Sequence, residues 1–226
     1  MLRKRLMVLI VLTGILQACS NSGDKDKTVV SDSVTAGETG ANKPVKNILF
    51  FGTSLTAGYG LDPTEAYPAL IQNRIDSLKM PYKVINGGLS GETSAGGKGR
   101  IDWLLKQKVD VFVLELGSND GLRGVPVAET TKNLQNIIDR VKAKYPDAKL
   151  VLAGMQMPPS MGTKYASDFK NMFPDLAKKN NMSLIPFLLE NVGGVPKLNQ
   201  ADGIHPTAEG DKILAENVWA VLKPLL

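Results

Sequence analysis

The chain has 226 residues, with 27 Lys and Arg against 22 Asp and Glu, 43% apolar residues and a formal net charge of +5. This length is typical of one domain, and so mild a charge balance argues against a disordered acidic protein or a nucleic-acid binder. A single Cys and a single His exclude an internal disulfide framework and a zinc site built from Cys and His. We therefore expect no metal, and any chemistry that needs an imidazole must use His205.

Residues 1–18 have the pattern of a secretory signal peptide. Basic residues at 3–5 precede an apolar stretch from Leu6 to Leu16, which is shorter than the ~20 residues that a membrane-spanning helix needs. The segment LQAC at 16–19 resembles the bacterial lipobox, in which cleavage leaves Cys19 as a lipidated amino terminus. We expect an exported lipoprotein of the bacterial cell envelope, facing the periplasm or the outer surface, with a membrane anchor at Cys19. Ordinary cleavage beside an incidental Cys is the alternative.

The segment that follows, up to residue 46, has the composition of a flexible tether. It is rich in Ser, Gly, Asp, Lys, Thr and Asn, and it contains no aromatic residue with which to build a core. A flexible segment of this length spans about 30 Å on average. We therefore divide the chain into a signal peptide at 1–18, a lipidated tether at 19–46 and a folded domain at 47–226.

Five short apolar runs in the domain indicate buried strands. They lie at 47–51, 82–85, 109–116, 149–153 and 183–186. Helical spacing of apolar residues separates the runs, and it is clearest over 127–141 and 214–222. Strands that alternate with helices predict an α/β fold with a parallel sheet covered on both faces, in which ligands bind beyond the carboxyl ends of the strands.

Three residues near strand ends and the last helix suggest nucleophilic catalysis. Ser54 lies two residues past the first strand, so a strand-to-helix turn would place its hydroxyl at the sheet edge. A serine nucleophile needs a base, and the base needs a third group to fix its tautomer. His205 is the sole histidine, and Asp202 precedes it at a spacing that lets the carboxylate reach one ring nitrogen. Pro206 suits the first turn of the last helix.

Each of these residues also has a simpler interpretation. Ser54 could cap a helix or bind a phosphate, and a lone histidine near a helix start is often structural. The loops at 88–93 and 117–121 offer donors for an oxyanion through the backbone at Gly91 and the side chain of Asn119. Gly91 could equally permit a turn, and Asn119 could form an Asx-turn.

The order of these residues resembles that of the four sequence blocks of the SGNH (GDSL-type) hydrolases. The blocks correspond to GTSL at 52–55, Gly91, Asn119 and the Asp202 to His205 segment. Within that superfamily the bacterial thioesterase I, lysophospholipase L1 and arylesterase branch is the most similar. The segments that carry this similarity are TSLTAGYGL at 53–61, GSNDGLRG at 117–124 and DGIHP at 202–206.

The resemblance implies a three-layer α/β/α sandwich with a flavodoxin-like parallel sheet of about five strands. It makes Ser54 the nucleophile, His205 the base and Asp202 the group that orients it. The oxyanion donors would be the N–H groups of Ser54 and Gly91 and the side-chain amide of Asn119. No cofactor is implied. The family usually has Asp immediately before the nucleophile, whereas this chain has Thr53, which leaves the polar support of the first loop open.

The expected substrates are small acyl esters, with thioesters and lysophospholipids as further candidates. Residues that would contact the acyl chain by this resemblance are Leu122, Met155, Met157 and Pro158. A carbohydrate O-acetyl esterase is the second enzyme hypothesis. A non-catalytic surface lipoprotein that binds phosphate or flavin through loop 52–60 is the alternative from another class, although no Lys follows Gly58 as a Walker motif requires. No obligate protein partner is inferred.

Overall fold

A computed structural model describes residues 44–226 of the chain. The expected signal peptide, the lipidation site at Cys19 and nearly all of the tether at 19–46 lie outside the described residues. The first strand, β1 (Lys46–Gly52), begins one residue before the expected domain start at 47. No helix within 44–226 combines the length and apolar character needed to cross a membrane.

The sheet has five parallel strands in the order β2-β1-β3-β4-β5, which is the flavodoxin-like order. The predicted parallel α/β fold is therefore confirmed. The third strand is shorter than the run at 109–116, and the fifth stops before Pro186, which has no N–H group for the strand ladder. The remaining strands are β2 (Tyr82–Asn86), β3 (Val111–Glu115), β4 (Lys149–Ala153) and β5 (Ser183–Ile185).

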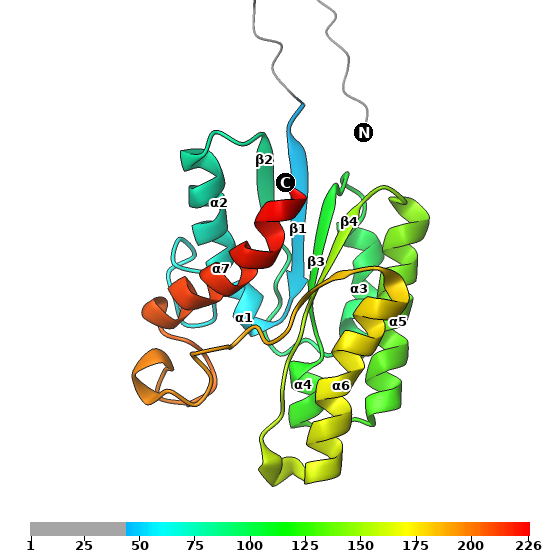
Figure 1. The fold of residues 1–226 in the computed structure, drawn as a ribbon, viewed down its shortest axis with the longest axis vertical. Helices are drawn as coiled ribbons and strands as arrows, with labels where there is room; N and C mark the ends of the chain where they lie inside the picture. The colour runs from blue at the N-terminus through cyan, green and yellow to red at the C-terminus, as the bar shows by residue number, and fades with distance from the viewer. Residues whose placement is uncertain (1–43) are drawn as a thin grey trace, which may run out of the picture. The chain divides into compact units, whose positions relative to one another are not determined.

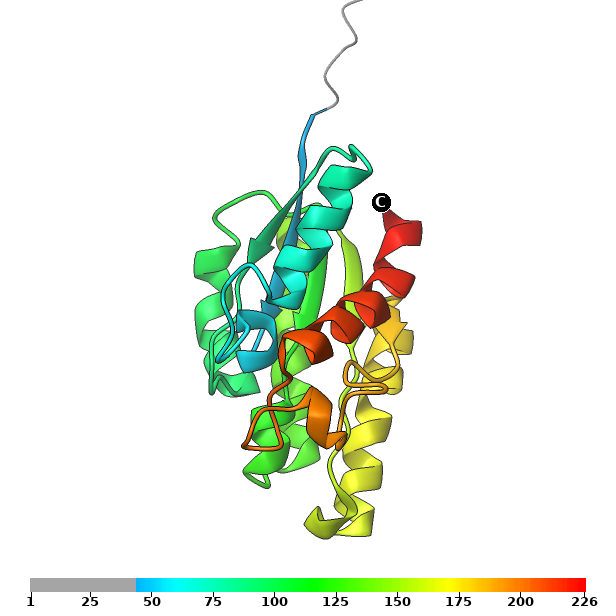
Figure 2. The same ribbon diagram turned by 90° about the vertical axis from the view of Figure 1, so that its left-hand side faces the viewer.

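Helices cover both faces of the sheet, as predicted for a three-layer sandwich (Figure 1). One face carries α2 (Tyr67–Ser77) and α7 (Ala208–Leu222), which lie in front of the sheet in Figure 2. The opposite face carries α3 (Ser94–Leu104), α5 (Val127–Lys144) and α6 (Thr163–Asn180). The short helices are α1 (Ser54–Ala57), α4 (Ser118–Leu122), and the 3₁₀ turns η1 (Pro159–Met161), η2 (Pro196–Leu198) and η3 (Lys223–Leu225).

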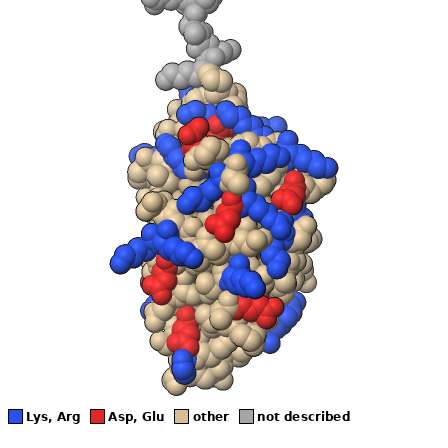
Figure 3. Space-filling view, turned by 90° about the vertical axis from the view of Figure 1, so that its right-hand side faces the viewer, with Lys and Arg blue, Asp and Glu red and all other residues tan. Residues whose placement is uncertain are grey.

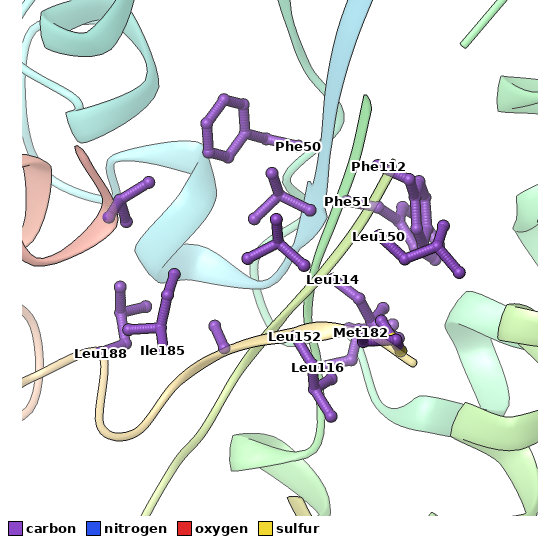
Figure 4. Packing of buried hydrophobic residues seen from close by; sticks show 14 of the residues in the cluster. Phe50, Phe51, Phe112, Leu114, Leu116, Leu150, Leu152, Met182, Ile185 and Leu188 are labelled. Carbon is purple, nitrogen blue, oxygen red and sulfur yellow. The ribbon is translucent and has the colours of Figure 1, made fainter. Parts of the chain in front are cut away.

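The apolar runs are continuous because alternate side chains of each strand enter different helix layers. Phe50 lies on one side of β1, and Phe51 lies with Phe112 on the other (Figure 4). Phe50 packs edge-on against Tyr67 of α2, with ring centroids 5.6 Å apart. The Phe51 ring lies under the guanidinium of Arg100 from α3. Both faces of β1 are therefore buried, and this packing holds the end of the strand that leads into Ser54.

The last helix begins later than predicted. Pro206 was expected in its first turn, but α7 begins at Ala208, and the Thr207 side chain accepts a hydrogen bond from the Gly210 N–H at 3.3 Å. Thr is a better N-cap residue than Pro because its hydroxyl satisfies a free helix N–H. Pro206 instead forms an isolated bridge with Asn199. The predicted apolar stripe of this helix is confirmed, since Leu214, Val218 and Leu222 are buried.

The surface over α3, α5 and α6 mixes both signs of charge (Figure 3). Ion pairs on these helices include Arg140 with Asp102 at 3.1 Å and Lys164 with Asp168 at 2.6 Å. Exposed pairs of this kind contribute little to stability, about 0–1 kcal/mol each. The free energy that holds this layer in place comes instead from its apolar contacts with the sheet.

Two glycines in α3 test this packing. A Cβ at Gly97 would lie 2.5 Å from a methyl carbon of Leu116, whereas a Cβ at Gly99 would meet nothing within 4 Å. We expect Gly97→Ala to lower the free energy of unfolding by about 1–3 kcal/mol through overpacking. Gly99→Ala, the matched control, should raise it by about 0.5–1 kcal/mol because Ala favours helix. Urea unfolding measures both, and an equal effect at the two positions would contradict the helix-to-sheet contact at Gly97.

Candidate functional site

Ser54 lies at the carboxyl edge of the sheet, where β1 passes into α1. The strand ends at Gly52, Thr53 is the N-cap, and Ser54 is the first helical residue. The Thr53 hydroxyl accepts a hydrogen bond from the Leu55 N–H at 3.5 Å and donates to the buried carboxylate of Glu115. Thr53 thus gives the first loop a polar support, which the sequence alone left open.

The structure brings the three predicted catalytic residues together. The Nε2 atom of His205 lies 2.9 Å from the Oγ of Ser54, which is 151 positions away in the chain. The other ring nitrogen, Nδ1, lies 2.6 Å from Oδ2 of Asp202. The second carboxylate oxygen of Asp202 accepts the N–H groups of Ile204 and His205, at 2.9 and 3.0 Å. These two bonds curl the loop so that Asp202 and His205 meet.

The hydrogen bonds fix the tautomer of His205. The hydrogen bond from His205 is the main reason that the pKa of Asp202 falls to about 2, with the Ile204 and His205 N–H groups as further causes. An ionised carboxylate can only accept hydrogen bonds, so Nδ1 must carry the proton. In neutral His205, Nε2 is then an acceptor and receives the hydroxyl proton of Ser54. This is the protonation state that a general base needs.

Two neighbours of His205 were not found from the sequence. The ring of Tyr59 packs on the imidazole, with centroids 4.6 Å apart. The side-chain amide of Gln200 donates to the carbonyls of Tyr59 at 2.7 Å and Pro206 at 2.8 Å, and the Gln200 N–H donates to the His205 carbonyl at 2.7 Å. Gln200 therefore ties the His205 loop to the loop after α1. Its position two residues before Asp202 was the available signal, but nothing in that spacing indicates a partner 141 positions away.

The predicted oxyanion donors lie on three neighbouring loops. Within residues 44–226, the N–H groups of Ser54 and Gly91 donate to no other protein group. Gly91 has φ 78°, so it does permit a turn, as the simpler interpretation required. The amide of Asn119 donates to the carbonyl of Glu92 at 3.1 Å, across to the Gly91 loop rather than in an Asx-turn. One of its two amide hydrogens remains available for a ligand.

Further contacts hold these donor loops together. The Arg123 guanidinium donates to the carbonyls of Asn119 and Gly91, at 3.2 and 3.3 Å. Behind them, buried Asp120 accepts the N–H and the hydroxyl of Ser94, at 2.7 and 2.5 Å. The loops of Gly91 and Asn119 are thus joined by bonds from the Asn119 and Arg123 side chains to backbone carbonyls.

A cleft of about 620 Å³ opens beside Ser54 and His205. All four residues expected to contact an acyl chain line it: Leu122, Met155, Met157 and Pro158. Further apolar lining comes from Phe187, Leu189 and Ile204, which the sequence interpretation missed. Phe187 and Leu189 follow the fifth strand, so the rule that ligands bind beyond strand ends would have found them. Asn119, which bonds to the Gly91 loop, lines the cleft, whereas Gly91 itself does not.

No group of three or more His, Cys, Asp or Glu residues suited to a metal occurs within 44–226.

The Asp202 carboxyl provides a direct test of this geometry. Because its pKa lies below the ordinary 3.8, the stability that it contributes is present above pH 3.8 and is lost as the pH falls through about 2. In His205→Ala we expect the pKa to rise but to stay below 3.8, because the two backbone donors remain. Carbon-13 NMR titration of the carboxyl groups measures this.

Asp62 serves as the internal control in that titration. Its pKa is lowered by hydrogen bonds from Thr64, which do not involve His205. The Asp62 titration should therefore be the same in both proteins. An Asp202 midpoint that stays at about 2 in His205→Ala would contradict the bond between the two residues.

Known proteins match almost the whole described domain. Esterase TesA of Pseudomonas aeruginosa is 42% identical over 182 residues, which cover 80% of this chain and 90% of that protein. Thioesterase 1/protease 1/lysophospholipase L1 of Escherichia coli is 37% identical over 180 residues, covering 79% and 84%. The crystal structure of esterase EstA from a Pseudoalteromonas species, inhibited by monoethylphosphonate, matches with a TM-score of 0.75 at 31% identity, covering 80% of this chain and 98% of that one. The GDSL-like lipase/acylhydrolase profile matches residues 50–213, and this chain therefore belongs to that family.

Proposed function

We propose that the chain is a serine esterase that hydrolyses carboxylic esters through Ser54, His205 and Asp202. The observation that carries this proposal is the pair of hydrogen bonds made by His205, at 2.9 Å to Ser54 and at 2.6 Å to Asp202. Membership of the acylhydrolase family and similarity to proteins named esterase support it.

In the first half of the reaction, Ser54 Oγ attacks the acyl carbonyl carbon while His205 Nε2 takes the hydroxyl proton. Negative charge then develops on the carbonyl oxygen, where the Ser54 and Gly91 N–H groups and the Asn119 amide would stabilise it. The tetrahedral intermediate collapses, the bond to the alcohol or thiol breaks, and His205 gives its proton to the leaving group. An acyl group remains on Ser54.

In the second half, His205 takes a proton from water, whose oxygen attacks the acyl-enzyme carbonyl. The ester bond to Ser54 breaks, the hydroxyl recovers a proton from His205, and a carboxylic acid leaves. Asp202 stays ionised throughout, which fits its pKa of about 2. Its role is to hold the imidazole and to stabilise the imidazolium that forms in each half.

The cleft supports esters with short- to medium-length acyl chains as substrates. Met155 and Met157 are almost fully buried along it, and their flexible side chains adapt to apolar ligands of different shape. Thioesters and lysophospholipids are further candidates, since a relative at 37% identity is named thioesterase 1/protease 1/lysophospholipase L1.

The two alternatives receive less support. A carbohydrate O-acetyl esterase needs a polar or aromatic surface for the sugar, but both Trp residues lie in helices, Trp103 in α3 and Trp219 in α7. A phosphate- or flavin-binding function does not need the bond between His205 and Ser54. Acyl chain-length preference separates the first alternative from the proposal, and loss of hydrolysis in variants separates the second.

For the amino-terminal segment, we propose signal-peptide cleavage, lipidation at Cys19 and a location in the bacterial cell envelope. The support is in the sequence: the basic residues at 3–5, the short apolar stretch and the LQAC segment that ends at the single Cys. The tether would then hold the esterase domain clear of the membrane surface.

We expect Ser54→Ala and His205→Ala each to lower kcat by about 10³-fold or more, because nucleophile and base act as one unit. Asn119→Ala should lower kcat by about 10²–10³-fold with a smaller effect on KM, because its amide acts mainly on the transition state. Hydrolysis of p-nitrophenyl esters from acetate to palmitate by the full chain measures these changes and the chain-length optimum.

Labelling with a phosphonate ester provides the control for these variants. The wild-type chain should gain the mass of one phosphonyl group at Ser54, and folded Ser54→Ala should gain none. An optimum at acetate would favour the carbohydrate esterase hypothesis. A folded wild-type chain that hydrolyses no ester or thioester and takes up no label would refute the proposed mechanism.

The location has its own test. We expect the wild-type chain, expressed in a bacterial host, to enter the detergent phase of a phase-separating detergent and to carry the mass of acyl chains on Cys19. Cys19→Ser should enter the aqueous phase, because a chain without acyl groups loses its membrane affinity. Identical partitioning of the two proteins, with no lipid mass on the wild type, would mean that the lipoprotein proposal is wrong.

A further inference from the structure

The carboxyl group of Glu115 lies buried beneath the Ser54 loop and takes no part in the proposed mechanism. Glu115 is the last residue of β3, is fully buried and pairs in register with Gly52 of β1. Within residues 44–226, none of the ion pairs formed by Lys, Arg or His includes Glu115. A charged group in such a place needs hydrogen-bond donors, because an unsatisfied buried charge is very costly.

Three donors point at this carboxyl group, and all come from residues that flank Ser54. The Thr53 N–H donates to Oε2 at 2.8 Å, and the Thr53 hydroxyl lies 3.0 and 3.1 Å from the two oxygens. The Thr56 hydroxyl donates to Oε2 at 2.8 Å. Glu115 thus contacts the chain one residue before Ser54 and two residues after it.

These contacts suit an ionised carboxylate, because the Thr53 N–H can only donate and both threonine hydroxyls are able to donate. A threonine hydroxyl has one hydrogen, so when Thr56 gives it to an ionised Glu115, the Tyr67 hydroxyl, 2.7 Å away, donates to Thr56. The donor chain therefore runs from Tyr67 through Thr56 to Glu115. Protonation of Glu115 would remove the negative charge that these donors stabilise.

The backbone is shaped to admit this carboxylate. A Cβ on Gly52 would lie 2.5 Å from Glu115 Oε2 and would overlap the Thr56 hydroxyl. Glycine at 52 thus leaves the space in which the carboxylate meets both threonines. Any larger residue there would push the carboxylate or the Ser54 loop out of place.

We propose that Glu115, as a carboxylate, is a positioning residue that holds Ser54 at hydrogen-bond distance from His205 by clamping Thr53 and Thr56. This inference rests on the proposed esterase function and adds to it a residue outside the catalytic triad. Nucleophile and base must be aligned within fractions of an ångström, and a misplacement of about 1 Å can cost about 10²-fold in rate.

The clamp should depend on pH. Burial raises the pKa of Glu115 to about 7, and the hydrogen bonds from the two threonines offset part of that rise. From α2 the facing titratable group is Tyr67, whose pKa is raised well above 10 by burial and by Glu115. From α7, Asp211 lies behind it and accepts the Tyr67 N–H at 2.9 Å. The carboxylate form is present above about pH 7, and protonation weakens the clamp as the pH falls through that value.

The main test compares wild type with Glu115→Gln, which keeps the shape but removes the charge. At pH values well above 7 we expect kcat to fall by about 10- to 100-fold while KM changes by less than about threefold. The ratio of wild-type to variant kcat should shrink as the pH falls from about 9 to about 5, because protonated Glu115 resembles Gln. The ratio removes any pH effect that is common to the two proteins.

Asp211→Asn is the matched control. Burial also raises the pKa of Asp211 to about 7, but its carboxyl bonds to the Tyr67 N–H rather than to any residue of 53–57. The corresponding ratio for Asp211→Asn should stay near one and should not change with pH. A constant ratio for Glu115→Gln, or an unchanged kcat, would overturn the proposal.

If Glu115→Gln does not fold, a pair of variants at Thr53 tests the same hydrogen bonds. Thr53→Ser retains the hydroxyl donor and should keep wild-type kcat, whereas Thr53→Val removes it and should lower kcat without a matching change in KM. Equal activity of the two folded proteins would count against the clamp.

A readout without catalysis separates this inference from the proposed function. Hydrogen exchange of the amides at 53–57, followed by NMR or mass spectrometry, should be faster in Glu115→Gln than in wild type. If the wild-type chain hydrolyses no ester, the esterase proposal fails, and this exchange rate alone decides whether Glu115 holds the loop: faster exchange supports the clamp, and unchanged exchange overturns it.

Discussion

The parallel pairing of β1 with β3 is the interaction on which the rest of the site depends. Its register sets Gly52 opposite Glu115, so β1 and β3 end side by side. The loops that carry Ser54 and Asn119 therefore begin next to each other at the carboxyl edge of the sheet. On the other side of β1, β2 pairs through Phe50 and Asn86, and its loop carries Gly91. Both faces of β1 are buried, so a shift of one residue would send every side chain into the wrong helix layer. The apolar pattern that builds the core therefore also aligns the three donor loops.

The loop that carries His205 is held by a different kind of force. It lies between β5 and α7, outside the sheet, and Asp202 and Ile204 are exposed within it. Polar side chains hold it: Asn199 donates to the carbonyls of Val192 and Val195 at 2.7 and 2.8 Å, and Gln200 bonds to the loop after α1. A segment with few apolar contacts and exposed hydrogen bonds opens more readily than the core. We therefore expect Ser54, which follows a buried strand, to be held more firmly than Asp202 and His205.

The sequence was sufficient to predict the sheet, the two helix layers and the residues that meet in the site, for reasons that can be named. Strands buried on both faces produce continuous apolar runs, and one His in 226 residues leaves few choices for a base. Residues whose roles depend on distant partners could not be found in this way. Glu115 bonds to Thr53 across 62 positions and Gln200 to Tyr59 across 141, and neither pair follows a local period. Pro206 was misplaced because Thr207 competes for the helix start, and the outcome depends on the bond from Gly210.

The buried carboxylate of Glu115 orders the Ser54 loop but lowers the stability of the fold. A carboxyl whose pKa rises from 4.5 to about 7 on folding binds its proton more tightly in the folded chain than in the unfolded one. The contribution of Glu115 to the free energy of unfolding therefore decreases as the pH rises from 4.5 to about 7, because the folded chain must bury a charge that the unfolded chain exposes to water. An apolar residue at 115 would avoid that cost, but it would leave the Thr53 N–H and two threonine hydroxyls without an acceptor next to Ser54. The charge thus destabilises the fold in the pH range where it orders the loop, which is the pattern expected of a residue retained for the site rather than for the core.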